Sequence, residues 1–133
     1  MRFKGEGGVV AVEFALVLPI LIVLIAGVIE FGFALYIQEV ITNASREAAR
    51  AGIVLGDPRP SAGEISNVAL SYMTNLGVSC GAACVSVAGS QGNSGDDLTV
   101  SVSVPYRFVI LEGFLEGWVG EITLHATATM KHE

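Results

Sequence analysis

One apolar stretch near the amino terminus constrains this chain more than any other feature. From Phe14 to Ile37 the only charged residue is Glu30. A helix rises about 1.5 Å per residue, so this stretch is long enough to cross a hydrocarbon core roughly 30 Å thick. The sequence therefore predicts a single membrane-spanning helix close to the start of the chain.

The residues ahead of the stretch predict its orientation. Arg2 and Lys4 lie on the amino-terminal side, and positively charged flanks tend to stay in the cytoplasm. The carboxyl-terminal part is then exported. We interpret residues 1–8 as a short leader that is removed. This leader carries Arg2, Lys4 and Glu6, a net charge of +1, so its removal takes the net charge of the chain from −6 to −7.

A cleaved secretory signal peptide is the competing interpretation. The apolar core of such a peptide is usually about 7–15 residues long, which is shorter than the stretch found here. The nearest small-x-small cleavage pattern, at residues 32–34, also follows the charged Glu30. We therefore favour a retained membrane anchor.

The rest of the chain predicts a small α+β domain. The first helix continues to about residue 55, and its apolar stripe consists of Ile37, Ile41, Ala44, Ala48, Ala51 and Leu55. Residues 56–60 break it. A capping box of Ser61 and Glu64 begins a second helix, which places Leu76 on its apolar face and ends at Gly77.

Three segments then alternate apolar and polar residues, as strands with one buried face do. They are Val85–Val87, Leu98–Val104 and Ile122–Met130. The polar run at 89–97 predicts a hairpin loop. We expect one antiparallel sheet of about three strands, covered by helices on one side. The expected divisions are a leader at 1–8, a membrane-spanning and extended helix at 9–55, and an exported α+β domain at 56–133.

The acidic balance and the lack of catalytic groupings exclude several functions. Nucleic-acid binding needs clustered Lys and Arg, which the exported part lacks. Neither His125 nor His132 has a Ser or Cys nucleophile at a recognisable spacing, so we expect no enzyme, no cofactor and no small-molecule substrate. The polar residues Asn93, Asp96 and Asp97 fit a turn better than a calcium loop.

The two cysteines predict a disulfide. Cys80 and Cys84 lie in an exported segment, where disulfides persist. They could also ligate a metal ion, but two thiols without nearby His or further Cys make an incomplete zinc site. We expect a disulfide closing a tight loop, and no metal site.

Glu13 marks the amino end of the apolar stretch. A carboxylate there is costly to hold in hydrocarbon and needs a partner or the membrane interface. If the chain is cut after Gly8, the new ammonium of Val9 can pair with Glu13 of an adjacent subunit. In the alternative reading, Glu13 only marks the inner boundary and favours the amino end of the helix electrostatically. The residues alone leave both readings open.

Glu30 lies about 25 Å further along the same helix, which is close to the thickness of a bilayer core. It could be buried and paired. We favour an interfacial position, because the residues around it resemble an aromatic belt: Phe31, Phe33 and Tyr36.

The segment at residues 109–119 is unusually apolar for a connection between strands. We expect it to close the open end of the domain core. The alternative is that it presents Phe114, Leu115 and Trp118 to a membrane surface or a partner protein.

Several sequence blocks resemble a known family. They are GVVAVEF at 8–14, AVEFALVLP at 11–19, IEFG at 29–32, NASREAARAG at 43–52 and ATATMKHE at 126–133. The first block resembles the processing site of type IVb prepilins. As a set, the blocks are similar to TadE-like proteins, which are pilin-like pseudopilins of tight-adherence, or Flp pilus, systems.

The resemblance implies a pilin-like fold and a non-enzymatic role in assembling, or forming part of, an adhesive pilus. It implies cleavage between Gly8 and Val9 by a prepilin peptidase, and a role in subunit assembly for Glu13 and Phe14. The implied location is the bacterial inner membrane, with a cytoplasmic amino terminus. The implied partners are the peptidase and other pilin-like and pilus-assembly proteins. A membrane-anchored exported binding module that never enters a filament is the alternative.

Overall fold

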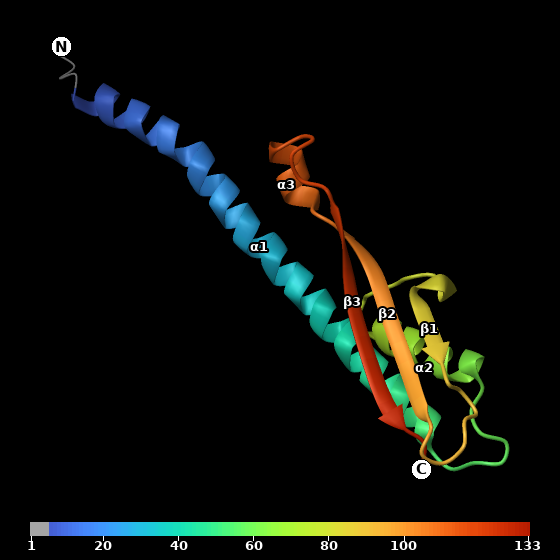
Figure 1. The fold of residues 1–133 in the computed structure, drawn as a ribbon. Coiled ribbons are helices and arrows are strands. Elements are labelled where there is room, and N and C mark those ends of the chain that lie inside the picture. The colour runs from blue at the N-terminus through green and yellow to red at the C-terminus, as the bar shows by residue number, and fades with distance from the viewer. Residues whose placement is uncertain (1–5) are drawn as a thin grey trace. The chain divides into compact units, whose positions relative to one another are not determined.

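The computed structural model describes residues 6–133, so the first five residues of the expected leader lie outside the described residues. A long helix leads into a helical and strand-containing region (Figure 1). The elements in chain order are α1 (Glu6–Ile53), α2 (Ala62–Asn75), a short 3-10 helix η1 (Ala82–Cys84), β1 (Val85–Ala88), β2 (Asp97–Arg107), α3 (Val109–Phe114) and β3 (Glu121–Lys131). The predicted α+β fold class is confirmed.

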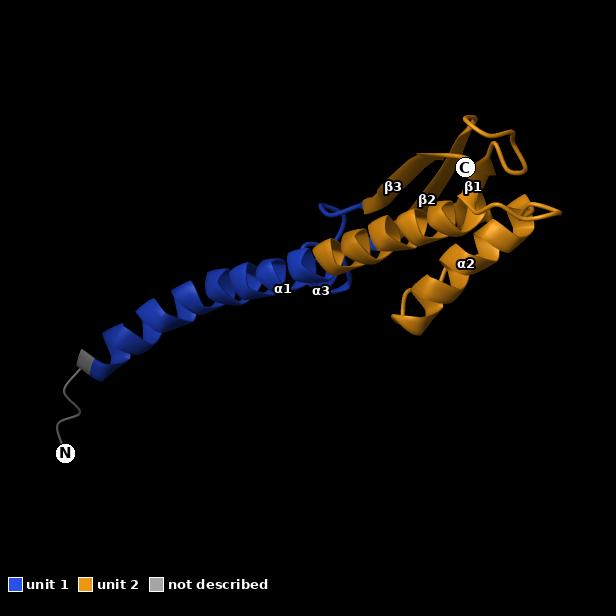
Figure 2. Cartoon of the chain, turned by 90° about the horizontal axis from the view of Figure 1, so that it is seen from below, with its two compact units in different colours: residues 1–33, 107–120 blue, residues 34–106, 121–133 orange. Residues whose placement is uncertain are grey.

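The chain divides into two compact units, which Figure 2 colours separately. Unit 1 contains α1 up to Phe33 together with residues 107–120, which include α3. Unit 2 contains α1 from Ala34 onward, α2 and the sheet. Helix α1 thus contributes to both units, and each unit has its own internal contacts.

The sheet of unit 2 has three strands in the order β1-β2-β3. Strands β1 and β2 are antiparallel, with Val85 opposite Val102. Between β2 and β3, the hydroxyls of Thr99 and Thr129 lie 3.1 Å apart, as do those of Ser101 and Thr127. Because the partner number falls as the residue number rises, these strands also run antiparallel. The hydroxyl pairs lie on the polar face, opposite the buried side chains.

One face of the sheet packs against α1 and α2 to form the core of unit 2. Its buried members are Val40, Ile41, Ala44, Ala48 and Ala49 from α1, Ile65, Ala69 and Met73 from α2, Val78 between the elements, and Val85, Leu98, Val100, Val102, Val104, Ala126 and Ala128 from the sheet. The small residues on α1 allow its backbone to approach its neighbours closely. The expected arrangement of one sheet with helices on its apolar face is confirmed.

The predicted apolar stripe of α1 was wrong at its carboxyl end. Ala51 is only half-buried and Leu55 is exposed, whereas Ala49 and Gly52 are buried. Helix α1 ends at Ile53, so Leu55 leaves the helical face. Within the helix, a period of 3.6 residues carries the buried face from Ala48 through Ala49 to Gly52.

Helix α2 begins and ends as its sequence predicts. The Ser61 backbone N–H donates to the Glu64 carboxylate over 2.8 Å, and the Glu64 N–H donates to the Ser61 hydroxyl, which completes the capping box. Gly77 adopts a φ of 78°, and the Val78 N–H donates to the Met73 carbonyl over 2.9 Å. Leu76 was expected on the apolar face but is exposed, because the helix has ended at the preceding residue.

Candidate functional site

The residues expected to act in processing and assembly lie in an exposed part of unit 1. Gly8, Val9, Glu13 and Phe14 are all helical residues of α1, and all four are exposed. A Cβ atom placed on Gly8 would meet nothing within 4 Å. These side chains are therefore available to molecules other than this chain, although their roles in cleavage and assembly stay predictions.

Helix α1 is, among residues 6–133, the one helix long and apolar enough to cross a membrane. Its most apolar window has a mean hydropathy of 2.9 and is only 6% buried. A core helix of a water-soluble protein would bury most of such a window. The exposed apolar surface therefore fits a single-pass membrane anchor.

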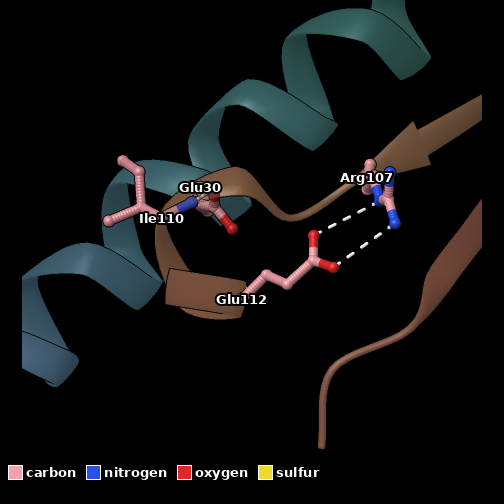
Figure 3. Close-up of polar contacts among 4 residues, drawn as sticks. All are labelled: Glu30, Arg107, Ile110 and Glu112. Atoms are coloured by element: carbon pink, nitrogen blue, oxygen red, sulfur yellow. Dashed lines mark hydrogen bonds and ion pairs between the residues drawn. The ribbon is translucent and has the colours of Figure 1, made fainter. Parts of the chain in front are cut away.

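Glu30 is buried and paired within the chain, while its interfacial position in a membrane stays a prediction. It is 2% exposed, and its carboxylate accepts a hydrogen bond of 2.5 Å from the backbone N–H of Ile110 (Figure 3). Ile110 belongs to the first turn of α3, where backbone N–H groups have no partner within the helix. The residue that precedes α3, Phe108, supplies no side-chain cap to these groups. Glu30 therefore supplies an acceptor to α3 from a different element.

A second carboxylate ties α3 to the end of β2. Glu112 forms an ion pair with Arg107, with 3.3 Å between Oε2 and Nε and 3.4 Å between Oε1 and Nη2 (Figure 3). The Arg107 side chain is 68% exposed and that of Glu112 is 41% exposed. Exposed ion pairs contribute little free energy, so this pair orients the turn more than it stabilises it.

The apolar segment at residues 109–119 does not close the core of unit 2. None of its residues belongs to that core, and α3 contains no buried residue. The segment groups instead with the amino-terminal part of α1 in unit 1. Phe114 and Leu115 are exposed, and Trp118 is 90% exposed. The core-closing expectation is therefore wrong, while contact with a membrane or a partner stays a prediction.

Cys80 and Cys84 are joined as a disulfide in the structure, with their Cα atoms 6.1 Å apart. That separation lies within the range of about 4.4–6.8 Å that disulfides span. The short loop between them contains η1. Formation of this bond in the exported protein stays a prediction.

The polar residues of the β1–β2 loop form a turn. The Asn93 N–H donates to the Asp96 carboxylate over 2.8 Å, and the Asp96 N–H donates to the Asn93 carbonyl over 3.0 Å. Asp97 pairs with Lys131 over 3.5 Å. Within residues 6–133 no group of three or more His, Cys, Asp or Glu side chains could hold a metal ion. The predicted turn is confirmed for Asn93 and Asp96, whereas Asp97 is the first residue of β2.

Sequence reasoning missed the structural position of His132. Its ring Nε2 lies 2.8 Å from the Gly89 carbonyl, and its backbone exchanges hydrogen bonds with Gly95 and Asp96. The side chain is buried and ties the end of β3 to the β1–β2 loop. A histidine next to the end of the sequence carries no periodic signal that could have indicated this.

A shallow cleft of about 400 Å³ lies on unit 2 between α1 and α2. It is lined by Glu47, Asn67, Val68, Ser71, Tyr72 and Asn75. Amide, hydroxyl and carboxylate groups of this kind can form hydrogen bonds with a ligand.

No curated protein and no solved structure matches the chain. A family match lies entirely within α1, and it includes the exposed apolar helix and the residues from Gly8 to Phe14 described above. Residues 8–50 match the family described as TadE-like protein, and over this segment the chain is similar to that family of pilin-like, Tad pilus-related proteins.

Proposed function

We propose that this chain is a minor pilin-like subunit of a tight-adherence, type IVb (Flp) pilus. In this proposal a prepilin peptidase cleaves the chain after Gly8, and α1 anchors the mature subunit in the bacterial inner membrane. The observation that carries the proposal is the TadE-like match over residues 8–50, because it coincides with an exposed apolar helix that carries Gly8 and Glu13. The proposed role is structural, so it requires no cofactor.

The proposed orientation keeps the amino terminus in the cytoplasm. The basic residues of the leader favour this side, and the domain built from residues 56–133 is then exported. An oxidising compartment outside the cytoplasm also fits the disulfide of Cys80 and Cys84. Cleavage on the cytoplasmic side would remove a net charge of +1 and create a new ammonium group at Val9.

Glu13 is the proposed assembly residue. Its carboxylate lies on an exposed part of α1, at the amino end of the apolar stretch. In lipid, such a charge needs a partner or the interface. The Val9 ammonium of a neighbouring subunit supplies one, and Phe14 beside it supplies apolar contact. Desolvation offsets much of the energy of a buried ion pair, so the pair acts mainly on the register and orientation of the two helices.

The test replaces Glu13 with Gln or Ala and measures how much of the chain co-purifies with the other pilus components. Removing the charge makes the stretch more apolar, so membrane insertion stays intact. We expect co-purification and adhesion to fall at equal membrane abundance. Glu39→Gln is the matched control, because Glu39 is an exposed carboxylate of the same helix outside the apolar stretch.

Two results would contradict the proposed role of Glu13. If the Glu13 variants assemble like the parent chain, the pairing fails and a membrane-tethered binding module becomes the better account. If the variants are lost from the membrane while Glu39→Gln is retained, Glu13 acts in anchoring and not in assembly.

A further inference from the structure

The segment at residues 107–120, which we call the foot, exposes an apolar surface that unit 1 leaves uncovered. Val109, Phe114 and Trp118 are exposed, and no residue of α3 is buried. On a water-soluble protein a cluster of this kind marks an interaction surface. The foot is short and strongly apolar, and its charged residues are Arg107, Glu112 and Glu116.

The foot lies against the apolar part of α1. Residues 107–120 and α1 up to Phe33 form one unit, and the hydrogen bond from Ile110 to Glu30 joins them directly. Ala26, one turn before Glu30, is also buried. The contact therefore fixes the position of the foot along α1, at the level of Glu30.

That level coincides with one boundary of the bilayer core. Glu30 lies about 25 Å along α1 from Glu13, and the hydrocarbon core is roughly 30 Å thick. With Glu13 at the inner boundary, Glu30 and the foot lie at the outer one. The exposed Phe31 and Phe33 follow Glu30 on α1, and Trp and other aromatic residues concentrate at this depth in membrane proteins.

We propose that the foot is an interfacial membrane-binding element that inserts Phe114, Leu115 and Trp118 into the outer leaflet beside α1. Lipid is the occupant because the foot is exposed and apolar and contacts the membrane-spanning part of α1 at the level of Glu30. The charged groups of Arg107 and Glu112 face each other in an exposed pair, as groups at the headgroup level can. This inference rests on the membrane insertion of α1 and not on its assembly into a filament.

Glu30 is the positioning residue in this arrangement. A carboxylate in apolar surroundings is tolerated when hydrogen-bond donors satisfy it. The Ile110 N–H is such a donor, and it gains from Glu30 the acceptor that the first turn of α3 lacks. The same bond thus satisfies two groups that would be costly to leave unpaired in lipid, and it holds the foot at a fixed depth.

Trp118 allows a direct test because it is the only tryptophan in the chain. The full chain is reconstituted in vesicles of phosphatidylethanolamine and phosphatidylglycerol, with bromine placed at a shallow or a deep position of the acyl chains. We expect blue-shifted emission, strong quenching by the shallow bromolipid and weak quenching by aqueous iodide. Emission like that of indole in water, with full iodide quenching and none from bromolipid, would overturn the proposal.

Two control variants give the quenching expected of a tryptophan in water and of a tryptophan within the membrane. Trp118→Phe combined with Ser94→Trp moves the reporter to an exposed position in the β1–β2 loop, where iodide should quench it fully. Trp118→Phe combined with Leu24→Trp moves it to an exposed position within the apolar stretch of α1, where the deep bromolipid should dominate and insertion is verified. If Trp118 emission is blue-shifted without bromolipid quenching, and the shift vanishes on dilution with lipid, the foot binds protein and the lipid proposal fails.

The role of Glu30 is tested with the same reporter. Glu30→Gln retains a carbonyl acceptor for the Ile110 N–H, so Trp118 should keep its depth. Glu30→Ala removes the acceptor, and we expect iodide quenching to rise toward the value of the Ser94→Trp control. Glu39→Ala, which removes an exposed carboxylate of α1 outside the apolar stretch, should change nothing. If Glu30→Ala leaves the quenching profile of Trp118 unchanged, Glu30 does not position the foot.

The outcome is independent of the proposed filament role. If the chain assembles normally but Trp118 stays in water, the proposed function is retained and the membrane-binding proposal for the foot fails. If the Glu13 variants assemble like the parent but shallow bromolipid quenches Trp118, the proposed function fails and the membrane-binding proposal for the foot is retained.

Discussion

At the scale of single residues, two acidic side chains of the same helix have opposite surroundings. Glu13 is exposed on α1, whereas Glu30 is buried and accepts a hydrogen bond from the first turn of α3. Spacing along the helix predicted that both would lie near the boundaries of the bilayer core. It could not predict the burial of Glu30, because the covering segment lies some eighty residues later in the sequence.

Gly52 is a residue whose size matters to the core. A Cβ atom at this position would overlap the side chains of Leu98 and Ile65, and it would lie 2.7 Å from the Ile65 Cδ1. We expect Gly52→Ala to lower the free energy of unfolding of unit 2 by about 1–3 kcal/mol, as overpacking does. The measurement is hydrogen exchange of the β2 amides in the micelle-solubilised full chain.

Gly63→Ala is the control for this substitution. A Cβ atom on Gly63 has only the Ser61 hydroxyl near it, at 4.0 Å. Alanine also favours a helix over glycine by up to about 1 kcal/mol. Gly63→Ala should therefore leave exchange unchanged or slow it. Equal behaviour of the two variants would show that α1 does not approach the sheet as closely as described.

The Cys80–Cys84 pair gives a redox prediction. Alkylation of native membranes without a reductant should leave both thiols unmodified, and alkylation after reduction should label both, because the two residues are within reach of one another. Mass spectrometry of the intact chain distinguishes the two states. Two freely alkylated thiols before reduction would exclude the disulfide.

At the scale of elements, the local signals of α2 predicted its structure well. The capping box, the buried face and the glycine stop each depend on residues within one or two turns of the helix, so the sequence contains them directly. The strands were predicted for a similar reason, since their alternation expresses one buried face. The α3 segment depends on contacts with a distant part of the chain, and periodicity did not indicate where it would lie.

The capping box of α2 makes stability depend on pH. The backbone N–H and then the hydroxyl of Ser61 donate to the Glu64 carboxylate and lower its pKa below the ordinary value of 4.5, while slight desolvation opposes them. Because the pKa is lower in the folded chain, the contribution of Glu64 is present above its unfolded value and is lost as the pH falls through the folded value. Stability should therefore be flat near pH 7 and decline below about pH 4.5.

Two variants isolate this effect. Ser61→Ala should lower the free energy of unfolding by about 1 kcal/mol at pH 7, as the loss of an N-cap does. Glu64→Gln should remove the part of the acid dependence that comes from Glu64. The measurement is thermal unfolding of unit 2 in the solubilised full chain between pH 3 and pH 7, followed by circular dichroism. An unchanged acid profile in Glu64→Gln would place the dependence on another group.

At the scale of the whole molecule, the α+β class, the long helix and the three-stranded sheet were predictable from periodicity. Which residues form each of the two compact units was not predictable, because residues 107–120 are far in sequence from the part of α1 with which they group. The division into a leader, a membrane helix and an exported domain stays a prediction. The TadE-like match covers residues 8–50, so it supports the role of the helix and leaves the role of the sheet-containing part to experiment.

The central claim is that this chain is processed like a prepilin, and the mass of the mature protein tests it most directly. The chain is isolated from native membranes of a host with an active prepilin peptidase, and its intact mass and amino-terminal residue are determined. The account predicts loss of residues 1–8 and a mature protein beginning at Val9, with the precursor accumulating in a peptidase-deficient host. Retention of Met1 in the active host would contradict the account.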